Sequence, residues 1–237
     1  MSFTNRLRQL AKSIWDAQYV HPFVVALGKG TLPERKFKYY ILQDARFLGD
    51  LSRVFAAGAL RAPDSDSALR FAKLAEETIT VERSLHENYG KRWKMTAKEM
   101  SSVPMAPTNY AYTRHMLTVA HTGSAAEITV VALPCAWIYC VVGQHLLEHG
   151  PPKRQSSLSG LAYALRLTGV CRSTGMDAQE SGPVGQDSRQ GRKATDGRIV
   201  RHQLAVRVDV LGDGVEGGRV AGVRGAGPGA GRTLKTN

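Results

Sequence analysis

The sequence predicts an all-α fold, a bundle of helices over residues 1–150, and three observations support this prediction. Apolar residues in this part of the chain recur every three or four positions, which is the period of an α-helix. Capping residues, glycines and prolines divide it into segments of helical length. No segment shows the sustained alternation of apolar and polar residues that is typical of a half-buried strand. Hydrophobic residues make up 43% of the whole chain, which is enough for a sizeable core.

The first long helix is predicted to begin within residues 31–34 (TLPE), which offer a capping residue and a proline at the first helical position. Apolar side chains follow at helical spacing from Phe37 to Leu51. The proline and aspartate at 63–64 then break the pattern.

A second long helix is indicated by Leu69, Leu74 and Ile79, and it runs toward Gly90.

Two capping boxes mark the starts of later helices, at residues 96–99 (TAKE) and 124–127 (SAAE). Between them, a helical segment over residues 108–121 stops at a glycine. The final helix of the bundle is predicted to run to Glu148, where a glycine and a proline follow.

The formal net charge of +12 raises the possibility of a nucleic-acid-binding regulator, so its distribution matters. Residues 1–150 carry 18 basic and 13 acidic side chains, whereas residues 151–237 carry 14 and 7. The excess is therefore concentrated in the C-terminal segment, and no helix-turn-helix or zinc-ligand spacing is visible. We expect no nucleic-acid partner, and steeply salt-dependent DNA binding is the observation that would favour this alternative.

The N-terminus (MSFTNR) has no apolar run that resembles a signal peptide. The longest apolar stretch, Ile128 to Val142, contains Pro134 and is shorter than a membrane span. These features predict a soluble, cytoplasmic protein without a membrane partner.

Residues 151–237 differ in character from the predicted bundle. They hold 16 of the 24 glycines but only one of the 17 aromatic residues, Tyr163. Such a composition cannot bury enough apolar surface to offset the entropy of ordering, so a disordered tail is expected.

The codons that could encode this segment suggest a second explanation. If the coding DNA is read one nucleotide downstream, with a free choice among synonymous codons, Ser156–Leu165 can become PAYRDWLTPY. In the same frame Val200–Gly212 can become FATSSLYEWMFW plus an acidic residue. We therefore predict a frameshift that begins between residues 150 and 156.

Four motifs together resemble the TenA (thiaminase II) family: residues 21–23 (HPF), 38–44 (KYYILQD), 110–116 (YAYTRHM) and 133–139 (LPCAWIY). The resemblance implies a heme-oxygenase-like helical bundle, usually a homotetramer, that binds no heme and needs no metal or organic cofactor. It also implies hydrolysis of aminomethyl-pyrimidine, a breakdown product of thiamin, or of thiamin itself, to hydroxymethylpyrimidine. The two strings of the shifted reading are similar to the family's last two helices.

The resemblance implies a role for five residues. Cys135 matches the nucleophile, whose thiolate adds to the electron-poor aminopyrimidine ring. Asp44 matches the carboxylate that grips the ring nitrogen and exocyclic amine. Phe47 stands where many relatives have tyrosine and keeps a stacking surface, while Tyr112 and Tyr139 match aromatic and hydroxyl contacts around the ring.

From the residues alone these positions have simpler interpretations. A lone cysteine on an apolar helix is usually an inert core residue, and either tyrosine alone is more typical of a core. Gln43 and Trp137 can each be either a core residue or a residue that supports the site.

The family's C-terminal glutamate, its proton donor, has no match in this sequence. The residues around Glu180 and Glu216 fit no motif of the family, so neither inherits that role. Tyr163 also lies outside any matching motif and inherits no role. General acid–base help is worth about 10²–10⁴-fold, so we expect severely impaired activity.

Two other functions are compatible with the same helical bundle. One is a non-catalytic or regulatory remnant of the family. The other is a di-iron oxygenase, for which Glu82 and His86 have a compatible i, i+4 spacing. Such a site needs glutamates and Glu-x-x-His pairs from several helices, and the sequence holds only this loose pair.

Overall fold

The computed structural model of the chain describes residues 3–148. Every regular element within this range is an α-helix. In chain order these are α1 (Phe3–Leu10), α2 (Lys12–Tyr19), α3 (Pro22–Gly28), α4 (Glu34–Arg61), α5 (Ser65–Trp93), α6 (Ala97–Ser102), α7 (Pro107–Thr122) and α8 (Ala125–Glu148). The predicted all-α fold class is thus confirmed for the described residues, and the predicted tail over 151–237 lies outside them.

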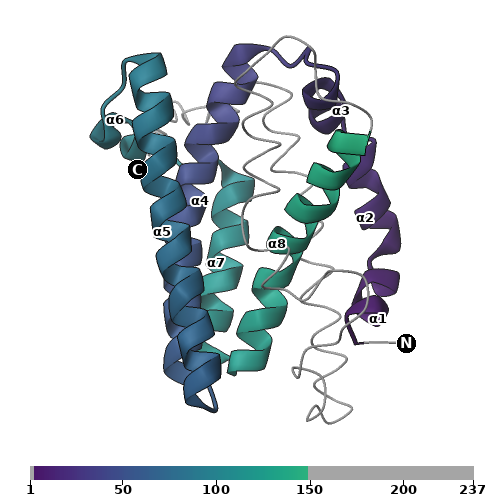
Figure 1. Cartoon of the computed structure of the whole chain (residues 1–237), viewed down its shortest axis with the longest axis vertical. Coiled ribbons are helices and arrows are strands. Elements are labelled where there is room, and N and C mark those ends of the chain that lie inside the picture. Colours follow the sequence, from purple (N-terminus) through teal and green to yellow (C-terminus); the bar gives the residue numbers. More distant parts are fainter. Residues whose placement is uncertain (1–2, 149–237) are drawn as a thin grey trace, which may run out of the picture.

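Helix α4 is the centre of the bundle and contacts α5, α6, α7 and α8. Figure 1 shows α5 along one side and the N-terminal helices α1 and α2 along the opposite side, with α4, α7 and α8 between them. Because α7 and α8 also pack on each other, the inner faces of α4, α7 and α8 enclose a common core. This core contains the residues that the sequence analysis singled out.

The four long helices agree with the sequence prediction, but the start of α4 differs. Pro33 is the N-cap, with extended backbone angles (φ −60°, ψ 137°), and Glu34 is the first helical residue. Thr31 does not cap the helix, since its hydroxyl donates to the Ala26 carbonyl oxygen at 3.5 Å. The prediction of proline at the first helical position was therefore wrong by one residue, because the fixed φ of proline suits either position.

Both predicted capping boxes are confirmed. At α6, the Thr96 hydroxyl accepts from the Glu99 amide at 3.2 Å, and the Glu99 carboxylate accepts from the Thr96 amide at 2.7 Å. At α8, Ser124 and Glu127 make the same exchange at 3.3 and 2.8 Å. Each box satisfies two backbone donors that a helix start leaves without an intrahelical partner.

The apolar residues that indicated α5 have a different role from the one their spacing suggests. Leu69 and Ile79 are 54% and 39% exposed and do not lie in the core. Helix α5 instead approaches α4 where Gly58 lies against the ring of Phe71; a β-carbon at Gly58 would come within 2.5 Å of that ring. The missing side chain at Gly58 allows the close approach of the two long helices.

The apolar stretch of α8 is longer than the predicted stretch from Ile128 to Val142. Ala125–Leu146 is long and apolar enough to cross a membrane by length and composition alone, so the expectation of too short a stretch was wrong. In this structure 56% of the apolar window is buried inside the bundle. A helix that is apolar on most of its surface belongs in a core, and α8 packs on α2, α4 and α7.

The N-terminal helices were not resolved by periodicity, because each has only seven or eight residues. Trp15 of α2 is buried, and its ring meets that of Trp137 of α8 edge-on at 4.8 Å. Helix α3 contributes Phe23 to a second core cluster that also contains Tyr40 of α4. The short helices therefore cover the outer side of α8 and the first turns of α4.

Candidate active site

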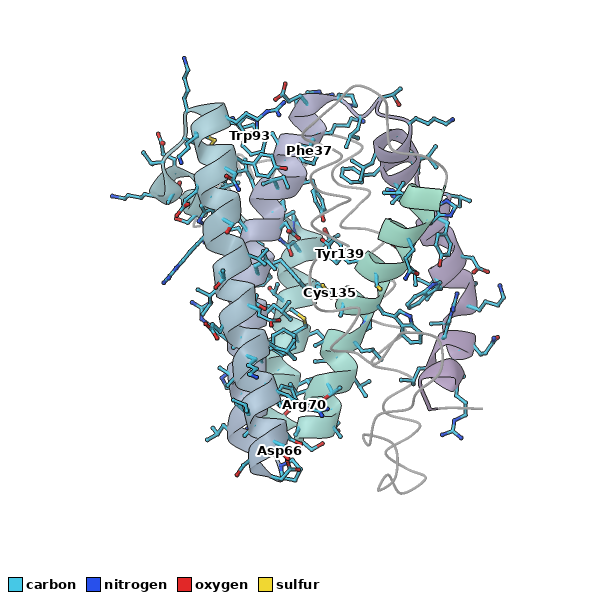
Figure 2. The ribbon with its side chains drawn as sticks, in the orientation of Figure 1. Phe37, Asp66, Arg70, Trp93, Cys135 and Tyr139 are labelled. Atoms are coloured by element: carbon cyan, nitrogen blue, oxygen red, sulfur yellow. The ribbon has the colours of Figure 1, made fainter. Side chains whose placement is uncertain are left out.

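One face of α4 contributes three side chains to the candidate site. Tyr40, Asp44 and Phe47 are four and three residues apart, so their side chains lie along the same face of the helix. On α8, Cys135 and Tyr139 are also four residues apart and share a face. Figure 2 shows these two side chains on the side of α8 that is turned toward α4 and α7.

The two faces are joined by a hydrogen bond between Tyr139 and Asp44. The Tyr139 hydroxyl donates to Oδ1 of Asp44 at 2.9 Å, across 95 residues of sequence. Both residues are half-buried, so the bond is partly shielded from water and its orientation is maintained by the packed helices. The hydroxyls of Tyr40 and Tyr139 are also hydrogen-bonded.

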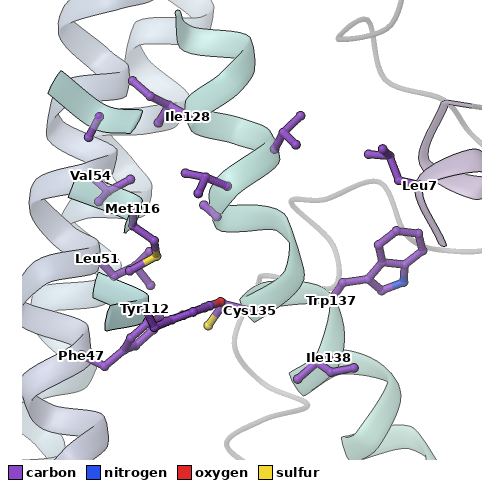
Figure 3. Close-up of a cluster of buried hydrophobic side chains, with 14 of the residues drawn as sticks. Leu7, Phe47, Leu51, Val54, Tyr112, Met116, Ile128, Cys135, Trp137 and Ile138 are labelled. Atoms are coloured by element: carbon purple, nitrogen blue, oxygen red, sulfur yellow. The ribbon is translucent and has the colours of Figure 1, made fainter. Parts of the chain in front are cut away.

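Helix α7 adds an aromatic wall. The Tyr112 ring stacks on the Phe47 ring with centroids 5.2 Å apart and planes inclined by 25°. Both rings are buried. In Figure 3 the phenol end of Tyr112 points toward the side chain of Cys135.

Cys135 itself is a reduced cysteine, 5% exposed. It follows Pro134, which lies inside α8 and has no amide hydrogen to donate to the carbonyl oxygen of Val130. The same core cluster contains Cys135, Phe47 and Tyr112. A soft, polarisable thiol therefore lies against an aromatic wall, with the Tyr139–Asp44 pair one helical turn away on α8.

Gln43, which the sequence left open between core and site, fixes α7 to α4. Its buried amide donates to the Pro104 carbonyl oxygen at 2.9 Å and accepts from the Ala106 amide at 2.8 Å. Asn109 donates to the Gln43 carbonyl oxygen at 2.9 Å. Since Ala106 is the N-cap of α7 and Asn109 precedes Tyr112 by almost one turn, this network sets the position of the aromatic wall. Trp137 is a core residue, packed on Trp15.

A second link between α4 and α7 is ionic. The Asp50 carboxylate, 7% exposed, is paired with Arg114 of α7 and, at 3.0 Å, with Arg53 of its own helix. The Arg114 guanidinium also lies over the Tyr110 ring, 5.0 Å from its centroid. The two partners neutralise a carboxylate that would be costly to bury alone.

The motif at residues 21–23 supports the site from α3. The Nδ1 atom of His21, the N-cap of α3, accepts from the Phe23 amide at 3.2 Å. The Phe23 ring in turn packs on the Tyr40 ring with centroids 5.0 Å apart. Burial lowers the pKa of His21 below its ordinary value of 6.5, which favours the neutral imidazole that accepts this bond.

Metal ligands are not grouped in the part of the chain that the structure describes: no three His, Cys, Asp or Glu side chains come together there. A di-iron centre requires such a group from several helices. The side chain of Glu82, one member of the predicted pair, lies outside the described side chains, and the described side chains form no such group.

The comparisons with known proteins follow the same motifs. The family model described as "TENA/THI-4/PQQC family" matches residues 8–161, well over half of the chain. The chain belongs to this family. The resemblance to TenA proposed from the four motifs is thereby confirmed, and the matched range contains every candidate site residue.

Relatives in this family agree with the assignment. An "Aminopyrimidine aminohydrolase" from Halalkalibacterium halodurans is 40% identical over 146 residues, which are 62% of this chain and 65% of the relative. The chain thus spans slightly less than two thirds of that relative's length. Among solved structures, a "TenA homologue protein from P.horikoshii OT3" has a TM-score of 0.80 at 25% identity, covering 92% of this chain and 100% of that one.

The fold expected for TenA relatives is confirmed as well. A domain with a heme-oxygenase-like fold from Shewanella denitrificans OS217 matches with a TM-score of 0.67 at 11% identity, over 90% of this chain and 92% of that one. At this identity the likeness concerns the fold alone.

The structure brings together all five residues that the sequence analysis selected, from three helices. Asp44 pairs with Tyr139, Phe47 stacks on Tyr112, and Cys135 lies beside Tyr112. Sequence reasoning missed Tyr40. Its i, i+4 spacing to Asp44 was a usable signal, but spacing alone does not identify the partner on α8.

Proposed function

We propose that this protein is a thiaminase II-type hydrolase that converts aminomethyl-pyrimidine, or thiamin itself, to hydroxymethylpyrimidine in thiamin salvage. The observation that carries the proposal is the Asp44–Tyr139 hydrogen bond beside Cys135, because it combines a hydrogen-bonding carboxylate with a nucleophile in a largely buried site. The name of the Halalkalibacterium relative, "Aminopyrimidine aminohydrolase", supports the same reaction.

In the proposed mechanism the Cys135 thiolate adds to the electron-poor pyrimidine ring, and a proton is taken up at the ring. The aminomethyl nitrogen, which carries a proton at neutral pH, then leaves as ammonia with the electron pair of its bond to the exocyclic methylene. Water adds to the methylene, the carbon–sulfur bond breaks, and Cys135 returns to the thiolate. The balance is one aminomethyl-pyrimidine and one water to one hydroxymethylpyrimidine and one ammonia.

Asp44 is proposed to bind the amino group on the ring and to support protonation of the ring nitrogen as the thiolate attacks. A carboxylate accepts about four hydrogen bonds, so one that accepts from Tyr139 can also accept from a bound amino group. The stacked rings of Phe47 and Tyr112 offer a flat apolar surface against which a pyrimidine can pack. Charge that develops on the ring in the transition state is then met by a group already oriented toward it.

The proposal includes a reading-frame change between residues 150 and 156. It is motivated by the glycine enrichment and aromatic depletion of residues 151–237 and by the two aromatic-rich strings that the shifted frame can encode. In this proposal the general acid of the family is missing, and the chain hydrolyses its substrate poorly. A non-catalytic family remnant is the second candidate, favoured by the same missing glutamate.

Assembly and location are part of the proposal. We expect a cytoplasmic homotetramer, and exposed apolar side chains on α4 and α5 support self-association. Leu60 is 84% exposed, and Leu69 is 54% exposed. Sedimentation of the purified protein tests this, since a monomer at all concentrations contradicts it.

The direct test of the function is product analysis. The protein is incubated with aminomethyl-pyrimidine, and hydroxymethylpyrimidine and ammonia are measured in parallel with a chain in which the reading frame is shifted after codon 150. We expect equimolar products, slowly from the given chain and about 10²–10⁴-fold faster from the frame-corrected one. If neither chain forms the products, the hydrolase proposal is wrong.

A further inference from the structure

The hydroxyl of Tyr40 is part of a chain of hydrogen bonds that ends on Asp44. A tyrosine hydroxyl has a single hydrogen. Tyr139 uses that hydrogen to donate to Asp44. The hydrogen bond between Tyr40 and Tyr139 must therefore be donated by Tyr40. The direction of the chain is thus Tyr40 to Tyr139 to Asp44.

We propose that Tyr40 is a positioning residue for the substrate-binding carboxylate, and that it acts on Asp44 through Tyr139. The inference rests on the proposed function, because it assigns to Asp44 the binding of the pyrimidine amine. Tyr40 is 7% exposed, and its hydroxyl is linked to Asp44 through the hydroxyl of Tyr139. It therefore does not need to touch the substrate.

The position of Tyr40 is fixed from two sides. It lies one helical turn before Asp44 on α4, so the two side chains face the same part of α8. Its ring packs against Phe23 at 5.0 Å, with planes inclined by 45°. Phe23 is itself held at the start of α3, where its amide donates to His21. The motif at residues 21–23, which the proposed chemistry does not use, is accounted for by this support.

The physical effect of Tyr40 is on the strength and direction of the second bond. A hydroxyl that accepts a hydrogen bond becomes a better donor, since linked hydrogen bonds polarise one another. The bond from Tyr40 also restricts rotation of the Tyr139 hydroxyl, so that its hydrogen is directed at Oδ1 of Asp44. The carboxylate is then oriented before substrate binds, which lowers the entropic cost of binding.

The test uses the full chain carrying Cys135→Ser, so that substrate is bound but not turned over, and titrates it with aminomethyl-pyrimidine by calorimetry. In this background Tyr40→Phe removes the hydroxyl but keeps the ring on Phe23. We expect the Kd to rise about three- to tenfold, the effect of one hydrogen bond. Tyr89→Phe removes a half-buried hydroxyl on α5 that takes no part in this chain of hydrogen bonds. It is the matched control and should leave the Kd unchanged.

Repeating the titrations in a protein that carries Tyr139→Phe distinguishes a positioning role of Tyr40 from a merely structural one. If Tyr40 acts through Tyr139, Tyr40→Phe should change the Kd no further once Tyr139→Phe is present. Phe23→Leu, which loosens the ring but keeps the Tyr40 hydroxyl, should weaken binding in the Tyr139 protein and not in Tyr139→Phe. This variant decides the question even if Tyr40→Phe does not fold.

The outcomes separate the two proposals. If the Cys135→Ser protein does not bind aminomethyl-pyrimidine, both the proposed function and the positioning role of Tyr40 are wrong. If that protein binds and Tyr40→Phe leaves the Kd unchanged, or weakens it equally with and without the Tyr139 hydroxyl, only the positioning role of Tyr40 is overturned. Loss of affinity that depends on Tyr139 supports it.

Discussion

The rings of Phe47 and Tyr112 lie nearly parallel, with centroids 5.2 Å apart and planes inclined by 25°, although they belong to different helices. Both are buried in the core that surrounds Cys135. The pair therefore belongs to the hydrophobic core and to the candidate site at once. Substitutions here are expected to change stability as well as binding.

Phe47→Ala should lower the free energy of unfolding by about 3–5 kcal/mol, because it removes a buried ring and leaves a cavity. The stacking on Tyr112 is included in this loss. The measurement is urea unfolding followed by circular dichroism. Arg35→Ala, at an exposed position of the same helix, should stay within about 0.5 kcal/mol. Equal losses at the two positions would show that Phe47 is not a core residue.

Gln43→Ala should destabilise the protein by about 2 kcal/mol or more, since it leaves the buried amide of Ala106 and the carbonyl of Pro104 without the partner they have now. The same unfolding measurement tests it, with Gln144→Ala at an exposed position of α8 as the control. We also expect Gln43→Ala to weaken pyrimidine binding, because the network positions α7 and Tyr112. A variant as stable as the unsubstituted protein would rule out the network as a link between α4 and α7.

His21 should make stability depend on pH in the mildly acidic range. Burial lowers the pKa of His21 in the folded protein, so the unfolded chain, with a pKa near 6.5, takes up a proton first as the pH falls. The stability contributed by the neutral ring is therefore complete above about pH 6.5 and is lost as the pH falls below it.

His21→Asn replaces the imidazole by a cap that does not titrate. Between about pH 7.5 and 5.5 the unsubstituted protein should lose more unfolding free energy than this variant. Glu34, Asp64 and Glu99 also have lowered pKa values, through hydrogen bonds to Arg92, Ser67 and Thr96 respectively, but these carboxylates affect stability only at lower pH. Identical pH dependence in the two proteins would contradict the role of His21.

The coding DNA provides a test of the proposed change in reading frame. Read one nucleotide downstream from about codon 150, it should encode the strings PAYRDWLTPY and FATSSLYEWMFW at the positions now read as 156–165 and 200–212. Early stop codons, or the absence of tryptophans at these positions, would refute the frameshift.

Most of the described fold could be predicted from the sequence, because long helices leave clear periodic and capping signals. The capping boxes at Thr96 and Ser124 are formed as expected. The short N-terminal helices could not be predicted in the same way, since two turns carry too little periodicity. The spacing at Leu69 and Ile79 identified a helix but not its buried face, which depends on the close approach of Gly58 and Phe71.

The candidate site was predictable only through the family motifs. Composition and spacing alone made Cys135 and Tyr139 look like core residues, and burial agrees with that description for Cys135. What the sequence could not provide was the pairing across helices. Tyr139 meets Asp44 across 95 residues, and the bond from Tyr40 becomes visible only once α4 and α8 are packed together.

Asp44→Ala should damage both binding and turnover of aminomethyl-pyrimidine in the frame-corrected chain. The carboxylate holds the amine in the ground state and stabilises the ring as charge develops, so KM should rise and kcat should fall. Steady-state kinetics measures both. A change in KM alone would limit Asp44 to binding.

The measurement that tests the central claim most directly is the turnover of aminomethyl-pyrimidine by the frame-corrected Cys135→Ser protein. Its substrate affinity is measured by calorimetry and its fold by circular dichroism. An alcohol is a far poorer nucleophile than a partly ionised thiol at neutral pH. We predict that Cys135→Ser folds normally, binds the pyrimidine with nearly unchanged affinity and loses most of its release of hydroxymethylpyrimidine. A Cys135→Ser protein that turns over substrate at the unsubstituted rate would contradict the assignment of Cys135 as the nucleophile.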